Sequence, residues 1–190
     1  MSSLLQDAIA AIESLQAEFP RLIVAIDGRC AAGKTTLAEA LGAHFGCTVL
    51  HMDDFFLQPH QRTSERLQTP GENIDHERFL EEVLLPLKAG HPFAYRSFDC
   101  HTMSLQSPRE VTPTALTVVE GSYSCHPALW EHYDLRLFLD IDAEQQLQRI
   151  RIRNGERCAA TFANRWIPLE EAYFNAYDLR RRCDVCLKNE

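Results

Sequence analysis

The feature that most constrains this chain is the segment Gly28-Arg29-Cys30-Ala31-Ala32-Gly33-Lys34-Thr35, which has the spacing of a phosphate-binding loop (P-loop). The continuous apolar run 22–26 precedes it, as expected for a strand that is buried on both faces of a parallel sheet. Residues 36–41 continue with a helix-forming composition. Because the spacing occurs between a strand and a helix, we interpret it as a P-loop rather than as a chance match on another turn.

The residue types in this loop suit a polyphosphate and its metal ion. Gly28 and Gly33 would let the backbone curl so that successive N–H groups converge on phosphate oxygens. The Lys34 ammonium would reach the β- and γ-phosphates, and the Thr35 hydroxyl would be a ligand of Mg²⁺. We therefore predict ATP as co-substrate with Mg²⁺, bound by Gly28, Ala31, Ala32, Gly33, Lys34, Thr35 and Thr36.

Strand patterns and helix patterns alternate along the chain, which predicts an α/β P-loop NTPase fold with a doubly wound parallel β-sheet flanked by helices. The further strands expected are 47–51, 115–121 and 135–140, and the further helices are 5–19, 75–88 and 143–153. The polar segment 58–73 predicts an exposed loop over a site, and 92–113 predicts a hairpin. No repeat or linker is evident, so we expect one domain, 1–190, with a small lid at about 154–165.

Acidic residues follow two of the predicted strands, at the sheet edge where ligands of α/β proteins gather. Glu120 would hold Mg²⁺ through water or orient the nucleophile, and an exposed turn acid is the alternative. Asp53 would accept the proton of an acceptor hydroxyl, and a turn or capping role shared with Asp54 is the alternative. Since a kinase that phosphorylates a phosphate needs no such base, Asp53 favours an alcohol as acceptor.

Arginines cluster where a lid would follow the last crossover helix, at Arg149, Arg151, Arg153 and Arg157. Guanidinium groups neutralise the charge that spreads over a transferred phosphoryl group, and a closing lid excludes water. Arg149 and Arg153 would share one helix face, whereas Arg151 points elsewhere. We predict a catalytic role for Arg153 and nucleotide contacts for Arg149 and Arg157, with a solvated charged face as the alternative.

Composition restricts the partners and the compartment that we expect. The formal net charge of -8 argues against binding to nucleic acid. No apolar run approaches the ~18 to 20 residues of a membrane span, and the N-terminus lacks the features of a secretion signal. Seven scattered cysteines predict reduced thiols in a cytoplasmic protein. Cys183 and Cys186 have metal-ligand spacing, but without a second pair we expect two half-buried thiols at a strand end rather than zinc.

The P-loop occurs together with four further motifs: Asp53-Asp54-Phe55-Phe56, Asn73-Ile74-Asp75-His76, Glu120-Gly121 and the lid arginines. Over residues 22–157 this combination resembles uridine kinases and their relatives, which include nicotinamide riboside kinases, phosphoribulokinases and bacterial pantothenate kinases. The sequence departs from uridine kinases at Phe56 and Ile150, where they usually have Tyr and Arg. The tail 165–174 matches neither uridine kinases nor nicotinamide riboside kinases well.

The resemblance implies roles for individual residues. Asp53 would be the catalytic base, Asp75 would contact the ribose hydroxyls, and the acceptor would also meet Phe56, Tyr95 and His101. Tyr95 and His101 fall where uridine kinases hold the pyrimidine, with a spacing one residue longer than expected. The alternative for Asp75 is a purely structural N-cap, because it stands at the start of a predicted helix.

The expected function is a nucleoside kinase that transfers the γ-phosphate of ATP to the 5′-hydroxyl of a ribonucleoside, as the resemblance to uridine kinases implies. A kinase for another small alcohol, such as nicotinamide riboside or pantothenate, is the alternative among enzymes. From another class, a nucleotide-dependent switch or regulator remains open, although the Asn-Lys-x-Asp motif of GTPases is missing. An oligomer is possible.

Overall fold

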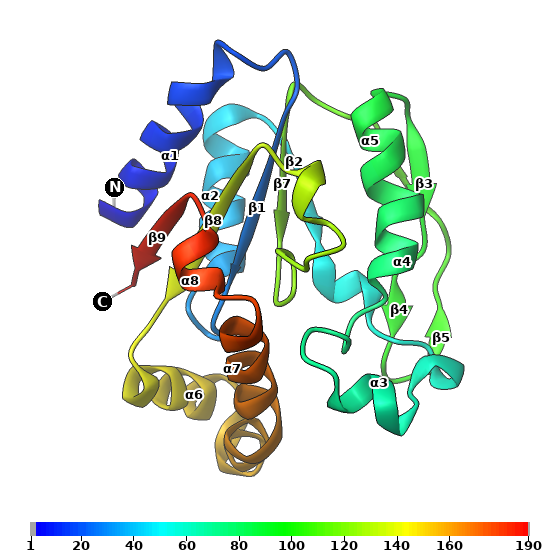
Figure 1. Cartoon of the computed structure of the whole chain (residues 1–190), viewed down its shortest axis with the longest axis vertical. Helices are drawn as coiled ribbons and strands as arrows, with labels where there is room; N and C mark the ends of the chain where they lie inside the picture. The colour runs from blue at the N-terminus through cyan, green and yellow to red at the C-terminus, as the bar shows by residue number, and fades with distance from the viewer. Residues whose placement is uncertain (1–2, 190) are drawn as a thin grey trace.

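The computed structural model describes residues 3–189, and a five-stranded sheet forms its centre (Figure 1). The strand order is β2 (Thr48–His51), β7 (Leu116–Glu120), β1 (Leu22–Gly28), β8 (Leu135–Asp140) and β9 (Val185–Lys188). Every neighbouring pair is parallel. Because β1 lies in the middle and later strands are added on both of its sides, the sheet is doubly wound, as predicted.

Side chains that alternate along β1 build two apolar cores, one on each face of the sheet. On one face Leu22, Val24 and Ile26 pack with α1 (Ser3–Gln16) and α2 (Lys34–Phe45). On the other face, Ile23 and Ala25 lie in a second core that includes residues of α4 (His76–Phe79), α5 (Leu85–Ala89), α7 (Ile167–Ala176) and α8 (Leu179–Arg182). All seven residues of β1 are buried, which explains why its first five, 22–26, form an uninterrupted apolar run.

The segment between β2 and β7 differs in part from its prediction. The predicted helix 75–88 is present from His76 to Ala89, with a π-helical stretch (Leu80–Leu84) in its middle. The predicted loop 58–73 contains a 3-10 turn (Pro59–Gln61) and α3 (Ser64–Gln68). The Thr63 hydroxyl accepts a hydrogen bond from the N–H of Arg66 (3.1 Å) and so caps α3, a local signal that the loop interpretation overlooked.

The predicted hairpin 92–113 is present as two short antiparallel pairs. β3 (Phe93–Tyr95) pairs with β6 (Arg109–Val111), and β4 (Phe98–Asp99) pairs with β5 (Ser104–Leu105). This hairpin lies beside α4 and α5, next to the β2 side of the sheet (Figure 1).

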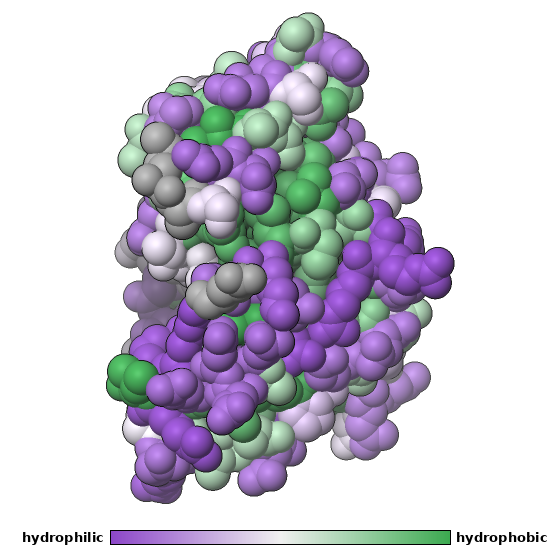
Figure 2. All heavy atoms as spheres, turned by 90° about the vertical axis from the view of Figure 1, so that its left-hand side faces the viewer, coloured by the Kyte–Doolittle hydropathy of each residue, from purple (hydrophilic) through white to green (hydrophobic). Residues whose placement is uncertain are grey.

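The C-terminal part contains the predicted helix 143–153, which is longer than expected, and further helices and a strand that were not predicted. α6 (Ala143–Thr161) bends at Gly155, whose φ and ψ are 80° and 166°, and continues through a π-helical turn (Phe162–Trp166) into α7. The helices α6 and α7 lie by the carboxyl ends of the central strands (Figure 1). Residues 151–158 are all exposed, and hydrophilic side chains predominate over hydrophobic ones at the lower end of the side view in Figure 2.

The cysteines are all free thiols, as predicted. Cys183 is buried and ends α8, whereas Cys186 is exposed within β9, so the expectation of two half-buried thiols was wrong. Among residues 3–189 no helix is long and apolar enough to cross a bilayer.

Candidate active site

The segment between β1 and α2 forms a tight loop around the N-terminus of α2. Gly28 has φ 128°, and a Cβ atom there would lie 2.1 Å from the carbonyl oxygen of Leu139, so only glycine fits. Ala31 and Gly33 also have positive φ, 60° and 98°, which curls the backbone into a concave row of N–H groups. Among the described residues no side chain caps α2, and its first N–H groups are therefore available to an anion.

Lys34 lies across this loop. Its side chain is 8% exposed, and Nζ donates to the carbonyl oxygens of Gly28 (2.6 Å) and Arg29 (3.0 Å). The loop thus carries a positive charge on a surface that already presents N–H donors. Phosphate oxygens could replace the carbonyl oxygens as partners of this ammonium group.

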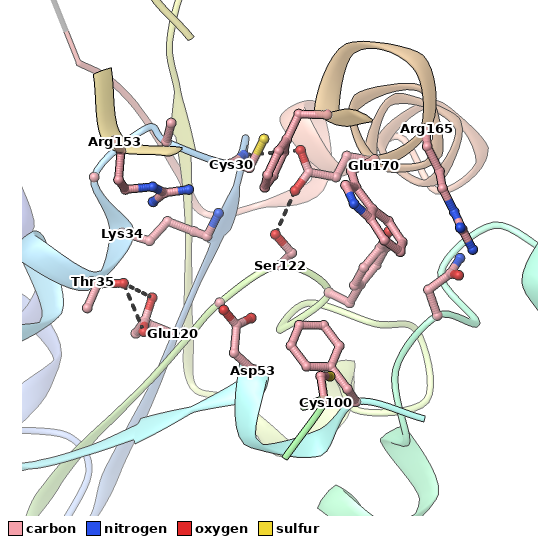
Figure 3. Close-up of a pocket in the computed structure, with 18 of the residues that line it drawn as sticks. Cys30, Lys34, Thr35, Asp53, Cys100, Glu120, Ser122, Arg153, Arg165 and Glu170 are labelled. Atoms are coloured by element: carbon pink, nitrogen blue, oxygen red, sulfur yellow. Dashed lines mark hydrogen bonds between the residues drawn. The ribbon is translucent and has the colours of Figure 1, made fainter. Parts of the chain in front are cut away.

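Thr35 and Glu120 form a pair of oxygen ligands beside Lys34 (Figure 3). The Thr35 hydroxyl lies 3.2 Å from both carboxylate oxygens of Glu120, which is 4% exposed at the end of β7. Hydroxyl and carboxylate oxygens are the hard ligands that Mg²⁺ prefers, so the two predicted metal residues fit this ion.

His51, which the sequence analysis missed, holds Glu120 from the neighbouring strand. Its Nδ1 lies 2.6 Å from Oε1 of Glu120, and the two residues are register partners of β2 and β7. This hydrogen bond raises the pKa of His51. The signal in the sequence was a histidine at the end of a predicted strand, but only the strand order brings it to Glu120.

Asp53 and Asp54 lie on a 3-10 turn (Met52–Phe55) after β2 and not on the strand itself. The turn passes close to Gly121 (φ 139°), where a Cβ atom would lie 2.9 Å from Cβ of Met52. Asp53 opens into the cavity, whereas Asp54 accepts a hydrogen bond from the hydroxyl of Tyr95 (2.7 Å). The two carboxylates therefore face different surroundings, because the turn points Asp53 toward the cavity and Asp54 toward Tyr95.

The surroundings of Asp53 favour its neutral form. Although Asp53 is exposed to the open cavity, the surrounding protein displaces part of the water around its carboxyl group and so raises its pKa. The nearby Glu120 adds to this shift, and Lys34 opposes it. A carboxylate with a raised pKa is a stronger proton acceptor, which is the property that a general base requires.

One cavity of about 730 Å³ joins these groups (Figure 3). It is lined by ten of the predicted site residues: Ala31, Gly33, Lys34, Thr35, Thr36, Asp53, Phe56, Glu120, Arg149 and Arg153. Three predicted nucleotide contacts are not among its lining residues. Gly28 ends β1, Ala32 is fully buried, and Arg157 is exposed on α6 beyond the bend.

Asp75, for which the resemblance implied a ribose contact, is not among the residues that line the cavity. It is 2% exposed and caps α4 by accepting a hydrogen bond from the N–H of Arg78 (3.2 Å). Its other oxygen pairs with the guanidinium of the same residue (3.3 Å). Since both oxygens are engaged within the fold, the structure favours the capping alternative.

Tyr95 and His101 also lie outside the cavity lining. Tyr95 is 2% exposed, and its hydroxyl is bound between Asp54 and Arg109 (3.1 Å). His101 is exposed at the tip of the hairpin, where its N–H donates to Asp99 (2.7 Å). The hairpin brings Cys100 rather than His101 to the cavity lining, and the pyrimidine contacts that the resemblance implied for Tyr95 and His101 stay a prediction.

The cavity is also lined by residues for which the sequence analysis predicted no role in the site. They are Cys30, Leu57, Arg62, Leu67, Asn73, Cys100, Gly121, Ser122, Tyr123, Phe162, Arg165, Trp166 and Glu170. Several of them come from the predicted loop 58–73 and from the tail after the lid, so the prediction that 58–73 lies over a site is supported by its lining residues. Glu170 had no sequence signal, because α7 was not expected.

A second cavity, of about 560 Å³, adjoins the first on the far side of the loop. Gly33, Thr36 and Arg149 line both cavities. Its other walls are residues of α1, α2 and the end of the described chain: Ser3, Leu4, Leu5, Leu37, Ala40, Lys188 and Asn189.

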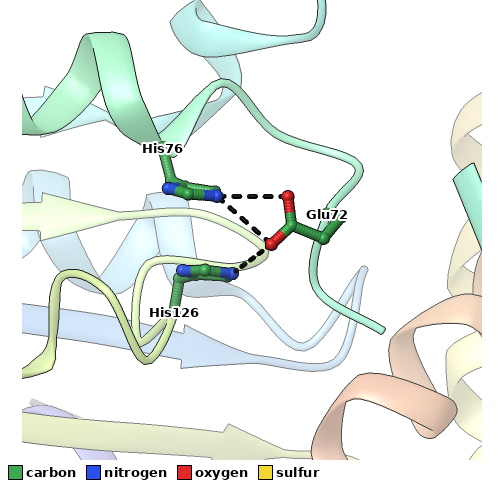
Figure 4. Close-up of side chains that lie close together, drawn as sticks. All are labelled: Glu72, His76 and His126. Atoms are coloured by element: carbon green, nitrogen blue, oxygen red, sulfur yellow. Dashed lines mark hydrogen bonds and ion pairs between the residues drawn. The ribbon is translucent and has the colours of Figure 1, made fainter. Parts of the chain in front are cut away.

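Glu72, His76 and His126 form a separate cluster (Figure 4). The two imidazole rings are stacked, with centroids 4.0 Å apart and planes inclined by only 13°. One metal ion cannot lie in both ring planes at a ~2 Å bond length, so this geometry does not fit a shared ion. The N–H of Ala128 donates to Nδ1 of His126 (3.2 Å), which leaves the proton on Nε2, toward Glu72. Burial lowers the pKa of His126 to about 3, so this imidazole is neutral near pH 7. His76 is within hydrogen-bond distance of Glu72 (3.1 Å), whereas Nε2 of His126 lies 3.5 Å from it.

Comparison with known proteins relates the chain to kinases. No family model matches it. Nicotinamide riboside kinase 2 of Mus musculus is 34% identical over 140 residues, 70% of this chain and 68% of that protein. A uridine kinase of Clostridium perfringens is 25% identical over 144 residues, with the same two shares.

Two solved structures share the fold over nearly the whole chain. A possible uridine kinase from Bacillus stearothermophilus has a TM-score of 0.66 at 22% identity and covers 95% of this chain and 99% of its own. A putative fructose transport system kinase from Silicibacter sp. TM1040 has a TM-score of 0.73 at 21% identity and covers 98% and 99%. These likenesses confirm the predicted α/β P-loop fold.

Proposed function

Because the chain belongs to the family of P-loop kinases that includes uridine kinases and nicotinamide riboside kinases, we propose that it transfers the γ-phosphate of ATP to the 5′-hydroxyl of a ribonucleoside. Phosphoryl transfer to a small molecule follows from the family, and the ribonucleoside is the proposal. The observation that carries it is one cavity onto which Lys34, the Thr35–Glu120 pair and Asp53 all open.

The nucleotide would lie along the P-loop. Its phosphates would bind the loop N–H groups and Lys34, and its adenosine would extend past Thr36 and Arg149 into the second cavity. Bound Mg²⁺ would neutralise phosphate charge, with Thr35 and Glu120 as the residues that hold it.

The proton of the acceptor hydroxyl would pass to Asp53. This carboxylate faces the same cavity as the P-loop, so a hydroxyl placed between them has a base on one side and a phosphoryl group on the other. Arg153 lines the cavity from α6 and would balance charge on the transferred group. Asp53, Lys34, Glu120 and Arg153 thus remain the proposed catalytic residues.

The acceptor end of the cavity suits a planar ring. Phe56, Tyr123 and Trp166 supply aromatic side chains, and Asn73 and Arg165 supply hydrogen-bond donors. Since Asp75 is occupied as a cap, the ribose hydroxyls would need partners other than its carboxylate. A second candidate acceptor is nicotinamide riboside, because the relative with 34% identity is a kinase named for it. Both acceptors carry a ribose, and they differ in the base.

The test is a panel of ribonucleosides, deoxyribonucleosides, nicotinamide riboside and pantothenate, incubated with the protein and Mg·ATP and analysed by mass spectrometry. We expect a gain of one phosphate on ribosides, and none with Lys34→Ala. Phosphorylation of pantothenate alone would replace the ribonucleoside with another alcohol. Slow hydrolysis of ATP without any phosphorylated acceptor would instead favour a switch or regulator.

A further inference from the structure

Glu170 places a buried carboxylate inside the phosphate-binding loop (Figure 3). Its side chain is 5% exposed and lines the cavity. Oε2 accepts a hydrogen bond from the N–H of Cys30 (3.1 Å), and Oε1 accepts one from the hydroxyl of Ser122 (2.7 Å). Because Cys30 is the third residue of the P-loop, this carboxylate holds a main-chain donor of the surface that binds phosphate.

The helix that carries Glu170 is fixed by two other contacts, one to the loop and one to β1. Glu171 pairs with the guanidinium of Arg29 (2.8 Å), and the hydroxyl of Tyr173 donates to Oδ2 of Asp27 (2.8 Å). Neither contact uses an N–H group of the loop. The position of α7 therefore does not depend on the bond between Glu170 and Cys30, and the Glu170 side chain can turn away while α7 stays in place.

Charge makes this contact unfavourable once a nucleotide arrives. The cavity already contains the carboxylates of Asp53 and Glu120, and a triphosphate would bring further negative charge next to Glu170. A carboxylate on a loop N–H occupies the place of a phosphate oxygen. Ser122 offers Glu170 a partner that it keeps when it leaves Cys30.

We propose that Glu170 is an internal anion of the P-loop, which holds the Cys30 N–H until a nucleotide phosphate displaces it. Glu170 is thus a positioning residue. It keeps the loop in its binding conformation, and it lowers the affinity of the loop for phosphate, because a phosphate must first displace the carboxylate. This inference rests on the proposed function, since it assumes that the loop binds nucleotide phosphate.

The test is the affinity of the whole protein for inorganic tripolyphosphate and for ATP, measured by titration calorimetry, with Glu170→Gln. Glutamine can accept from Cys30 and donate to Ser122, so the fold is retained while the charge is removed. A hydrogen bond to a carboxylate is stronger than one to a neutral amide, so a phosphate displaces glutamine from the Cys30 N–H more easily than it displaces glutamate. We therefore expect the Kd for tripolyphosphate to fall by ~10-fold or more. The gain should shrink as salt is added, because the effect is electrostatic.

Glu171→Gln is the matched control. It removes the same charge from the adjacent residue, which faces the Arg29 side chain and not a loop N–H. The hydrogen bond between Tyr173 and Asp27 still holds α7 in this variant, and we expect Kd to change by less than ~3-fold. An unchanged or higher Kd in Glu170→Gln, or an equal gain in Glu171→Gln, would overturn the inference.

Amide NMR provides an independent measurement of displacement. In the unsubstituted protein the Cys30 N–H resonance should shift on saturation with tripolyphosphate, and an unshifted resonance would mean that Glu170 keeps its bond. If the unsubstituted protein binds neither tripolyphosphate nor ATP, the proposed function itself fails. If it binds both and Glu170→Gln behaves identically, only the role of Glu170 fails.

Discussion

Replacing Asp53 with asparagine would remove the proposed base while keeping the shape of the side chain. Loss of a positioned general base lowers turnover by ~10² to 10⁴, which corresponds to about 3 to 5 kcal/mol of activation free energy. Among residues 3–189 Asp53 forms no hydrogen bond or ion pair that would hold the fold together, and its side chain lines the cavity, so we expect stability and ATP affinity to be maintained.

The pH dependence of the same variant tests the mechanism separately. Asp53 accepts a proton only when it is ionised, and exclusion of water raises its pKa above that of a solvated aspartate. The kcat/KM of the unsubstituted protein should therefore fall as the pH is lowered, and this fall should begin at a higher pH than for a solvated aspartate, whose pKa is about 3.9. In Asp53→Asn this acidic limb should disappear.

Asp54→Asn is the control, because Asp54 has the same chemistry but faces Tyr95. An amide oxygen still accepts the hydrogen bond of this hydroxyl, so we expect kcat within ~3-fold of the unsubstituted protein. The assay is steady-state phosphorylation of the best acceptor over pH 4 to 9. A larger loss in Asp54→Asn, or an acidic limb that persists in Asp53→Asn, would refute the assignment.

Three further predictions concern the loop, the cap and the lid. Lys34→Ala should lower turnover by ~10³ or more without unfolding the protein, as measured by initial rates and circular dichroism. Asp75→Ala should lower the free energy of unfolding by about 1 to 2 kcal/mol and the Tm by about 2 to 8 °C, because the cap of α4 is lost. Its kcat/KM should stay within ~3-fold of the unsubstituted protein, and a 10-fold loss of kcat/KM at unchanged Tm would favour the ribose contact instead. A bisubstrate analogue should protect residues 149–165 from proteolysis if α6 closes about Gly155, and equal cleavage with and without it would count against a closing lid.

The sequence by itself determined the features that depend on neighbouring residues. The order of strand, loop and helix follows from an apolar run, Gly28 and Lys34, which are close together in the sequence. Gly28 has a positive φ, and glycine adopts this conformation without steric cost, so the residue type alone indicates the turn. The same holds for Asp53 and Glu120: residues that follow parallel strands must meet at one edge of the sheet, whichever strands are neighbours.

Only the tertiary structure decided which distant groups meet at that edge. His51 reaches Glu120 because β2 and β7 are adjacent, and Glu170 reaches the Cys30 N–H across 140 residues of sequence. The role of Asp75 could not be read from the local sequence, because an acid that precedes a helix can either cap it or face a ligand. The choice depends on whether the carboxylate oxygen that does not cap the helix has a partner inside the fold. Here Arg78 is that partner. Local patterns fix backbone conformation, whereas contacts between distant segments depend on how strands are ordered and helices packed, and no single segment contains that information.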